Sequence, residues 1–478
     1  MSVPRTIFIS ADHGLAIVYF LQSDVVDSLI SGGAQVVLLT DDDLVDSIRE
    51  RFGRPGLVID GLRLEAAKRY FNRYQPNRQW WLDFLRRAGA SNKINLEAVD
   101  SYVNQVKAEA HRRRKLLFPL MQLLVGILRR SRAARRWLVR AQRQFTADIY
   151  GDIFDQYQPD LVIASTPGWR YDRYLLRQAA ARGVSTAAVI VGWDNSSSYS
   201  LPGAKVDYIN CWSEVQKQEL MLGSDWRAEQ IHIGGIPSYD GYFTQRWEMP
   251  RDTYFEKHGL DPARKLIAYA SSFITFSPNI QNIDALAEMV SGDELAAPSQ
   301  LLVRLHPNHF MDVERFAAER EQVRALAAAY PHVHVVEPAS LGGSLGHYSG
   351  EDMDEKASMM AHADVFVTVY STMVVEASAH QAPVVSACID SPEGWPHNFT
   401  LPLSRIGDWP THSRFRDSNA GRVAYDKVEL REALNFYLQQ PEAHLAARKA
   451  FIQREVTYTD ASAGRRTGEY LLSLAEGA

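Results

Sequence analysis

The sequence predicts an α/β protein built from two domains, each with a parallel sheet covered by helices. Its 478 residues exceed the about 250–300 residues at which a single hydrophobic core stops growing. Short apolar runs rich in β-branched residues alternate with longer helical stretches along most of the chain. A break rich in glycine and proline near Ile236–Arg251 separates two such series, so two cores of similar size are expected.

Ten apolar runs are predicted to form strands. Those of the first half are Thr6–Ser10, Gln35–Thr40, Asp160–Ser165, Ser185–Val191 and Val206–Cys211. Those of the second half are Lys265–Ala270, Gln300–Leu305, His332–Val336, Asp364–Tyr370 and Pro383–Cys388. Near-continuous apolar strands separated by helices are typical of parallel sheets buried on both faces. Because ligands of such sheets bind at the carboxyl ends of the strands, residues that directly follow a strand are the functional candidates.

The predicted domain boundaries follow from this pattern. Residues 1–245 form the first domain, with a basic and apolar helical insertion at about 105–145, and residues 246–426 form the second. Between them, Gly234-Gly235-Ile236-Pro237 ends one strand, and a polar stretch leads to Pro250. Residues 427–478 are predicted to form the final helices.

The composition is that of an ordinary soluble protein. The chain is 46% apolar and 23% charged with a formal charge of -5, which gives no reason to expect a nucleic-acid partner. Two cysteines, Cys211 and Cys388, are too few for a disulfide framework or a cysteine-rich zinc site. The N-terminus passes directly into a strand without the pattern of a secretory signal, so a cytoplasmic location is expected.

One segment departs from the alternating pattern. The apolar run Leu116–Leu128 is flanked by the basic clusters His111–Lys115 and Arg129–Arg140. Thirteen residues are too few to span a bilayer, which takes about 20, but such a helix can lie on an anionic membrane surface. The expected membrane contacts are Arg129, Arg130, Arg135, Arg136 and Trp137. The alternative is a helical hairpin packed on its own domain with solvated arginines.

The end of the strand Gln300–Leu305 carries Arg304 and His306 before Pro307. Alternate residues of a strand share a face, and the proline turn would place the imidazole at the strand tip. A cation and a hydrogen-bond donor at this position suit a diphosphate. The alternative is that His306 only caps the backbone.

Hydroxyl groups follow two other strands of the second half. Ser371 and Thr372 open a helix after Asp364–Tyr370, where side-chain hydroxyls and free N–H groups suit phosphate. Glu376, deeper in that helix, could accept hydrogen bonds from both hydroxyls of a ribose. Ser271 and Ser272 follow Lys265–Ala270 and could reach the same phosphates. The alternatives are that Ser371 only caps the helix, that Glu376 is solvated, and that Ser271 and Ser272 belong to a polar loop.

The turn Asp12-His13-Gly14 connects the first strand to a helix. Gly14 permits close approach of a ligand, such as an acceptor, to the backbone. Asp12 or His13 could act as a general base that faces the cleft, a role worth about 10²–10⁴ in rate. The alternative is that Asp12 caps the helix and His13 is structural.

The strand Ser185–Val191 ends in Gly192-Trp193-Asp194-Asn195 and three serines. An indole can stack on a sugar ring while a carboxylate and an amide bind hydroxyl pairs, so Trp193 and Asn195 are expected to contact an acceptor. Asp194 is a third candidate for the catalytic base. An Asx-turn that ends the strand is the alternative.

These motifs together resemble the GT-B glycosyltransferases of bacterial surface-polysaccharide biosynthesis. The motifs are Arg304-Leu305-His306-Pro307, Ser371-Thr372 with Glu376, Pro383-Val384-Val385, Gly235-Ile236-Pro237 with Asp240, and Trp193-Asp194-Asn195. The resemblance is strongest to the CDP-glycerol glycerophosphotransferase-like branch, with the non-hydrolysing UDP-GlcNAc 2-epimerases as cousins. It implies two Rossmann-like domains that face a central cleft, with residues 427–478 crossing back to the first domain. Ser196-Ser197-Ser198 depart from the Leu-Thr and basic residue that usually follow Trp-Asp-Asn.

The resemblance also implies roles for the site residues. The nucleotide would lie on the second domain, with Arg304 and His306 near the phosphates, Ser371 and Thr372 on the diphosphate and Glu376 on the ribose. The acceptor would approach from the first domain. No cofactor and no bound metal are expected, because a helix start and basic side chains stabilise the leaving diphosphate in such enzymes.

The predicted function is therefore transfer of a sugar from a nucleotide-sugar donor to a glycan or lipid-linked acceptor, with inversion and without a metal. One alternative is a CDP-polyol phosphotransferase or a CMP-sugar transferase that uses the same cleft. Another is a non-catalytic protein of GT-B shape that docks on membranes. On each interpretation the protein is cytoplasmic, or peripheral on the inner face of the cytoplasmic membrane.

Overall fold

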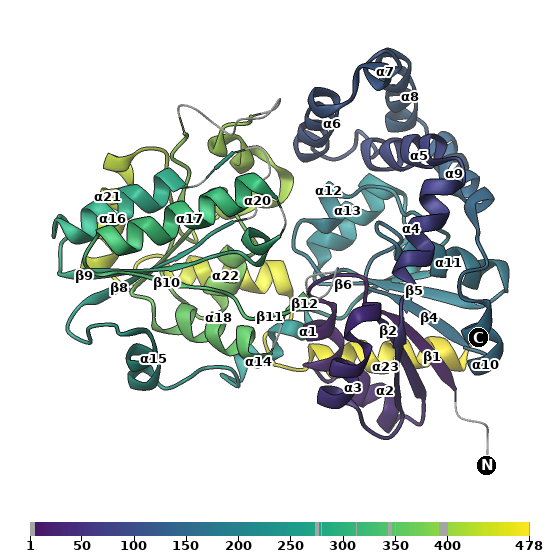
Figure 1. The fold of residues 1–478 in the computed structure, drawn as a ribbon, viewed down its shortest axis with the longest axis horizontal. Coiled ribbons are helices and arrows are strands. Elements are labelled where there is room, and N and C mark those ends of the chain that lie inside the picture. The colour runs from purple at the N-terminus through teal and green to yellow at the C-terminus, as the bar shows by residue number, and fades with distance from the viewer. Residues whose placement is uncertain are drawn as a thin grey trace.

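The computed structural model describes residues 5–272, 277–278, 280–311, 313–342, 347–348, 350–391 and 400–477. They form two parallel sheets, each covered by helices, that lie beside one another in the molecule (Figure 1). The N-terminal half of the chain builds the first sheet and the C-terminal half builds the second, as the sequence predicts.

The first sheet has seven parallel strands in the order β3-β2-β1-β4-β5-β6-β7. The strands are β1 (Thr6–Ser10), β2 (Gln35–Thr40), β3 (Leu57–Gly61), β4 (Leu161–Ala164), β5 (Ser185–Val189), β6 (Tyr208–Cys211) and β7 (Ile231–Ile233). β1 is buried along its whole length, with Phe8 opposite Val37 on one side and Val162 on the other. The strand order reverses between β1 and β4, which places the crevice of this sheet after these two strands.

The second sheet has six parallel strands in the order β10-β9-β8-β13-β14-β15. They are β8 (Lys265–Ala270), β9 (Ser299–Arg304), β10 (Val333–Val336), β13 (Val365–Thr368), β14 (Val384–Ala387) and β15 (Arg422–Ala424). A small antiparallel pair, β11 (Ser340–Gly342) and β12 (His347–Tyr348), stands apart from it. Here the order reverses between β8 and β13, so the crevice lies beside the residues that follow those strands.

All ten predicted strands are present, and three strands of the two large sheets were not predicted. β3, β7 and β15 are edge strands. β7 and β15 have three residues each, and β3 alternates buried with half-buried positions and ends in Asp60 and Gly61. Short or half-exposed strands lack the continuous apolar run on which the prediction relied.

The helices and short 3₁₀ turns cover the sheets. In the first half they are α1 (Ala16–Leu21), α2 (Val25–Ser31), η1 (Asp42–Leu44), α3 (Val45–Phe52), α4 (Leu64–Arg73), α5 (Pro76–Ala88), α6 (Glu97–Glu109), α7 (Arg112–Lys115), α8 (Phe118–Arg130), α9 (Arg132–Ala141), η2 (Gln142–Phe145), α10 (Gly151–Tyr157), α11 (Asp172–Ala181), α12 (Asn195–Ser198), α13 (Glu214–Ser224) and η3 (Ala228–Gln230). In the second half they are η4 (Pro237–Tyr239), α14 (Asp240–Phe243), α15 (Arg251–His258), α16 (Ile280–Ser291), η5 (Pro307–Phe310), α17 (Glu314–Ala329), α18 (Gly350–His362), α19 (Met373–Ala379), η6 (Leu403–Asp408), α20 (Pro410–Asp417), α21 (Lys427–Gln439), α22 (Leu445–Val456) and α23 (Ala463–Glu476).

The final helices differ in where they pack. α23 crosses to the first domain and lies against α2 (Figure 1). Gly464 and Gly468 allow this close approach, because a Cβ at Gly468 would stand 2.5 Å from the Cβ of Ser28. α21, by contrast, packs on β14 and β15 of the second sheet and buries Leu430 and Leu434 there. The expectation that the whole of 427–478 returns to the first domain is therefore wrong for α21.

The segment that connects the two domains is largely buried. Tyr239, Tyr242 and Trp247 are all buried, although the sequence around them reads as polar. Tyr242 also donates a hydrogen bond of 2.5 Å to Glu376 of the second domain. The aromatic rings thus fasten the chain between the two cores, and Gly235, with a φ of 86°, provides the left-handed turn that precedes them.

The helical insertion is longer than predicted, since helices occupy the chain from Leu64 to Phe145 between β3 and β4. α5, α8 and α9 share a small apolar core that includes Phe84, Phe118 and Leu138. The insertion therefore packs on its own domain, as one of the two interpretations held. In the part of the chain that the structure describes, no helix is long and apolar enough to cross a membrane.

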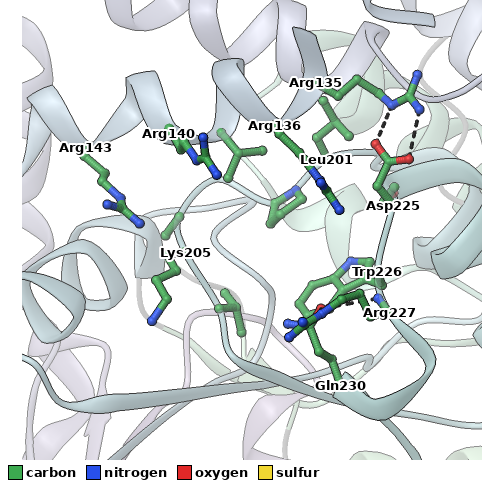
Figure 2. A pocket seen from close by; sticks show the side chains of 15 residues that line it. Arg135, Arg136, Arg140, Arg143, Leu201, Lys205, Asp225, Trp226, Arg227 and Gln230 are labelled. Atoms are coloured by element: carbon green, nitrogen blue, oxygen red, sulfur yellow. Dashed lines mark hydrogen bonds and ion pairs between the residues drawn. The ribbon is translucent and has the colours of Figure 1, made fainter. Parts of the chain in front are cut away.

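Two of the arginines expected to touch a membrane are structural. Arg135 is buried and forms a two-pronged ion pair with Asp225, with distances of 2.6 and 2.9 Å (Figure 2). Arg129 pairs with Asp100 at 2.7 Å and donates to the carbonyl of Ala88. Their guanidinium groups hold the insertion together, so the expectation of membrane contact is wrong for these two residues. The expected contacts Arg130, Arg136 and Trp137 are exposed.

Candidate functional site

A pocket of about 590 Å³ lies between the two domains. Its first-domain wall comprises Arg87, Ala98, Ser101, Tyr102, Gln105, Val106, Glu109, Asp194, Ser198 and Tyr199. Its second-domain wall comprises Ser272, His306, Val369, Tyr370, Ser371, Thr372, Ile406, Trp409 and His412. Most of the second wall is thus built from residues that follow β8, β9 and β13, on both sides of the reversal in strand order. This is where an open parallel sheet binds its ligand.

His306 presents a neutral imidazole to this pocket. Its Nδ1 accepts a hydrogen bond of 3.1 Å from the backbone N–H of Asn308, so the proton of the neutral ring is assigned to Nε2. Burial of the ring, followed by the charges of nearby cations, lowers the pKa of His306 to about 3. The side chain is therefore an uncharged hydrogen-bond donor at neutral pH.

Three hydroxyl groups stand beside His306 in the same wall. Ser371 accepts a hydrogen bond of 3.1 Å from the N–H of Met373, at the start of α19. Thr372 follows it, and Ser272 donates to the carbonyl of Val369 at 2.9 Å. The hydroxyls are held by the strand ends, in positions where they can bind the oxygens of a ligand. Ser271, also buried, is not part of the pocket wall.

Arg304 and Glu376 are not available to a ligand in this structure. The guanidinium of Arg304 is buried in an ion pair with Asp352. Glu376 is buried as well and pairs with Lys356 at 2.6 Å. Asp352 and Lys356 lie four residues apart on α18, so one face of that helix takes up both partners. The expected contacts of Arg304 with phosphate and of Glu376 with ribose are therefore corrected to structural ion pairs.

Asp194 faces the second domain across the pocket. Its carboxylate accepts a hydrogen bond of 2.9 Å from the hydroxyl of Ser198, one turn further along α12. Burial raises the pKa of Asp194, while the hydrogen bond from Ser198 opposes that shift. Of the three residues expected to be a catalytic base, Asp194 is the one that lines the pocket.

Asp12 is wholly buried at the end of β1. It accepts a hydrogen bond of 2.8 Å from the N–H of Asp172, and the guanidinium of Arg170 approaches to 3.6 Å. The expectation that Asp12 faces the cleft as a base is therefore wrong, because its carboxylate anchors the start of α11. His13 is half-buried and its Nδ1 accepts from the N–H of Leu15 at 3.1 Å, beside Gly14 in the same turn. Neither His13 nor Gly14 lines the interdomain pocket.

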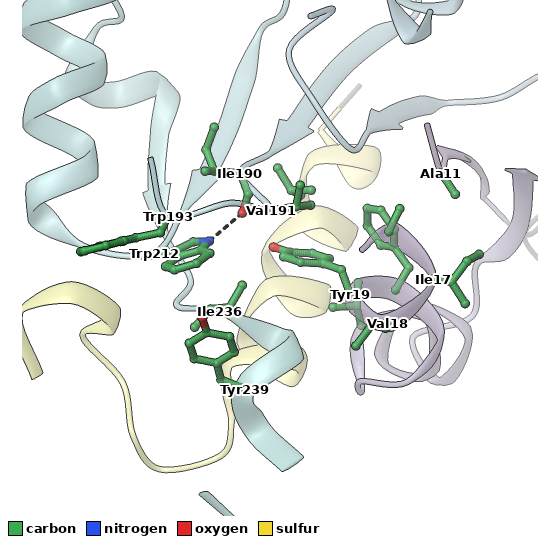
Figure 3. Close-up of a cluster of buried hydrophobic side chains, with 14 of the residues drawn as sticks. Ala11, Ile17, Val18, Tyr19, Ile190, Val191, Trp193, Trp212, Ile236 and Tyr239 are labelled. Atoms are coloured by element: carbon green, nitrogen blue, oxygen red, sulfur yellow. Dashed lines mark hydrogen bonds between the residues drawn. The ribbon is translucent and has the colours of Figure 1, made fainter. Parts of the chain in front are cut away.

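Trp193 and Asn195 are structural rather than acceptor-binding. The indole of Trp193 is fully buried near Trp212 and Ile190 (Figure 3), and its N–H donates to Glu455 of α22 at 2.7 Å. Asn195 accepts from the N–H of Gly192 at 2.8 Å and so closes the turn after β5. A ring with no exposed surface cannot stack on a sugar, which corrects the expected role of both residues.

Several wall residues were not predicted. Tyr102 and Arg87 come from the helical insertion, and Trp409 and His412 come from the segment between β14 and β15. None follows a predicted strand end, and each reaches the pocket through a fold in the chain that joins distant segments. The local sequence carries no signal for such positions.

Comparisons with known proteins agree with this architecture. No family model matches the sequence, and no curated protein matches it either. Among solved structures, the UDP-GlcNAc 2-epimerase from Neisseria meningitidis bound to UDP-GlcNAc matches with a TM-score of 0.54 and 10% identity, over 98% of this chain and 100% of that chain. A glycosyltransferase from Rickettsia africae matches with a TM-score of 0.51 and 8% identity, over 99% and 100% of the two chains. A putative UDP-N-acetylglucosamine 2-epimerase from Listeria monocytogenes matches with a TM-score of 0.52 and 12% identity, over 97% of this chain and 94% of that chain.

The protein thus has the GT-B fold, with two Rossmann-like domains and an interdomain pocket between them. The likeness extends over nearly the whole length of each chain. It does not single out the CDP-glycerol branch to which the sequence motifs point, and at 8–12% identity it establishes the fold alone.

Proposed function

We propose that the protein is a glycosyltransferase that transfers a sugar from a nucleotide-sugar donor to an acceptor hydroxyl in the interdomain pocket. The observation that carries this proposal is the composition of the two walls. The second-domain wall presents neutral hydrogen-bond donors, His306 and the hydroxyls of Ser371 and Thr372, and the first-domain wall presents a single aspartate, Asp194, opposite them. A transferase needs both groups: donors that bind a leaving diphosphate and a base that removes the acceptor proton.

The donor half of the mechanism rests on His306. A neutral Nε2–H donates a hydrogen bond to a phosphate oxygen without adding a charge, and Ser371 and Thr372 donate from the neighbouring strand end. As the bond between the sugar and the diphosphate breaks, negative charge grows on the oxygens that these groups contact. Prearranged donors stabilise that charge more in the transition state than in the bound substrate. In this proposal they need neither a metal nor a cofactor.

The acceptor half rests on Asp194. The acceptor oxygen attacks the anomeric carbon, its proton passes to the carboxylate of Asp194, and the nucleoside diphosphate leaves. A single displacement of this kind inverts the anomeric centre. The raised pKa of Asp194 makes its carboxylate a stronger base than an exposed aspartate. Trp409 adds an aromatic ring to the second-domain wall, on which a sugar or nucleobase can stack.

The proposal is tested with a panel of UDP-, GDP-, CDP- and CMP-sugars. Each is scored first by thermal shift and then by turnover with glycan and lipid-linked acceptors. At least one nucleotide is expected to stabilise the protein, and the Ser371→Ala, Thr372→Val double variant to lose most of that shift. Thr244→Val, a threonine outside the pocket, is the matched control. Asp194→Asn should keep the thermal shift and lower kcat by about 10²–10⁴.

The products separate the competing functions. A phosphate retained on the acceptor would indicate a polyol phosphotransferase, and epimerised donor formed without an acceptor would indicate an epimerase. Nucleotide binding without turnover would leave the non-catalytic interpretation. If no nucleotide of the panel stabilises the protein, the proposed nucleotide-sugar site is refuted. If kcat is unchanged in Asp194→Asn but falls in His13→Gln, the catalytic base is His13 instead.

We further propose that the helical insertion docks this transferase on an anionic membrane surface, where a lipid-linked acceptor would lie. Leu116, Leu120, Leu123 and Ile127 follow the helical spacing and are 82%, 52%, 62% and 47% exposed. Residues 110–147 hold eleven arginines or lysines and no acidic residue. Arg129, Arg132 and Arg135 pair with aspartates outside this segment, and the other basic residues stand among the exposed apolar side chains, as is typical of an interfacial helix.

A further inference from the structure

A second pocket, of about 320 Å³, lies on the first domain and shares no wall residue with the interdomain pocket. It is bounded by α9 and the turn after it, by residues 201–206 and by residues 224–230 (Figure 2). Three segments distant in the sequence therefore meet around one cavity, and nothing in the proposed transfer reaction uses it.

The walls of this pocket are strongly basic. Arg135, Arg136, Arg140, Arg143, Lys205 and Arg227 line it, and Asp225 is the one carboxylate among its wall residues. Asp225 is already neutralised, because Arg135 binds both of its oxygens. Lys205 and Arg227 find acidic partners outside the wall, Asp207 at 2.6 Å and Glu229 at 3.2 Å.

The other three arginines of the wall come from α9 and η2. Arg136, Arg140 and Arg143 stand at helical spacing on one side of α9 and η2, from which they project toward Lys205 and Arg227 (Figure 2). Within the described residues, none of the three forms an ion pair. Like charges gathered around a cavity repel each other, and a bound anion would relieve that repulsion. Guanidinium groups are also the side chains that bind phosphate oxygens in a two-pronged fashion.

Apart from Ser224 and Gln230, the rest of the wall is apolar and includes Val139, Val206 and the buried ring of Trp226. An anion that binds here would set its charged group among the arginines and a less polar portion against these side chains. We propose that this pocket is a binding site for a ligand with at least two phosphate charges, separate from the interdomain pocket. The phosphate groups come either from a soluble phosphorylated compound or from a lipid headgroup.

Inorganic pyrophosphate and vesicles distinguish the two sources. The pocket variant is the triple substitution R136Q/R140Q/R143Q. The control is R49Q/R246Q/R465Q, which removes three exposed arginines outside both pockets. Isothermal titration with pyrophosphate at low salt reports the soluble source. Cosedimentation with vesicles that contain cardiolipin, a lipid with two phosphates, set against phosphatidylglycerol vesicles of equal total charge, reports the lipid source. Hydrogen exchange with and without pyrophosphate locates the bound anion.

If the ligand is soluble, the affinity of the pocket variant for pyrophosphate is expected to fall by at least about tenfold, while that of the control changes by less than about twofold. In the unmodified protein, pyrophosphate should slow hydrogen exchange in residues 136–143 and 224–230. For a lipid headgroup, the same contrast is expected with cardiolipin vesicles instead. Equal losses in the two variants would show diffuse charge and overturn the proposal, as would an unmodified protein that binds neither probe. Because both variants keep the interdomain pocket intact, a failure here is separate from a failure of the nucleotide panel.

Discussion

Asp12 and Asp172 form a pair of wholly buried carboxyl groups at the crevice of the first sheet. Burial raises the pKa of Asp12, and burial together with the negative charge of Asp12 raises the pKa of Asp172 to about 7. Two carboxylates this close cannot both ionise cheaply, so near neutral pH the pair shares protons. The hydrogen bond from the N–H of Asp172 to Asp12 survives either way, which explains why the turn tolerates the pair.

This pair makes stability depend on pH. A carboxyl group whose pKa rises on folding binds its proton more tightly in the folded state. Its contribution to the free energy of unfolding is therefore fully present below about pH 4 and is lost as the pH rises through about 7. We expect the free energy of unfolding to fall between pH 4 and 7.5 more steeply in the unmodified protein than in Asp172→Asn. Urea unfolding at several pH values measures this. Asp46→Asn, at a fully solvated carboxylate, is the control, and identical slopes in all three proteins would contradict the expectation.

Some of the candidate site residues could be placed in the pocket from the sequence, and others could not. Asp194, His306 and Thr372 were placed in the pocket from their positions after strands, because topology alone brings strand ends together. Trp193 follows a strand as well, yet its ring is in the core. The direction in which a side chain points after the strand ends depends on partners such as Glu455, 262 residues away, which no local pattern reveals.

The insertion is the element whose surface is most unusual. α8 places Val125 and Leu128 in its own small core and leaves Leu120 and Leu123 in solvent. A solvated leucine face has no stability function, and substitution there leaves the core unchanged. The exposed leucines therefore test the proposed docking surface better than the arginines, two of which hold the fold together.

We expect Leu120→Gln with Leu123→Gln to weaken binding to phosphatidylglycerol vesicles by about tenfold or more, because each buried leucine contributes about 1.5–3 kcal/mol on leaving water. Vesicle cosedimentation measures the loss, and unchanged thermal unfolding would show that the fold is intact. The control is Leu222→Gln, an exposed leucine on α13. Undiminished binding in the double variant would leave charge alone as the cause of any association.

The sequence predicted elements best where the apolar pattern is long. β1, β2 and β8 were placed with both ends correct, because each is buried along nearly its whole length. The edge strands β7 and β15 are held by pairing with a neighbouring strand, and three residues carry too little pattern to be found.

The whole molecule is fastened across its two domains by a buried ionic network. Arg414, on α20, pairs with Glu219 of the first domain at 2.8 Å and with Glu455 of α22 at 2.9 Å. The same region carries the hydrogen bond of 2.9 Å between Ser197 and Thr411. These contacts fix the loop that bears Asp194 against the second domain, so the width of the pocket depends on them.

Arg414→Met is expected to destabilise the protein by about 3–5 kcal/mol, because it leaves the buried carboxylate of Glu219 without its cation and leaves Glu455 with only the partly exposed Arg454. Arg454→Met removes a cation from the same Glu455, but Arg454 is 42% exposed, and a loss below about 1 kcal/mol is expected there. Thermal and urea unfolding of the two variants measure the contrast. Equal losses would mean that solvent already screens the Arg414 network.

The return of α23 to the first domain has a consequence for how the chain is made. The face of α2 that receives this helix is complete early, but the helix itself is synthesised only after the whole second sheet. At about 5–20 residues per second, roughly 12–50 s of synthesis separate the end of β7 from the end of α23. During that interval the nascent first domain has an apolar face without its cover, so its folding cannot finish until α23 has been synthesised. We infer that this unfinished domain is the species that a chaperone would meet.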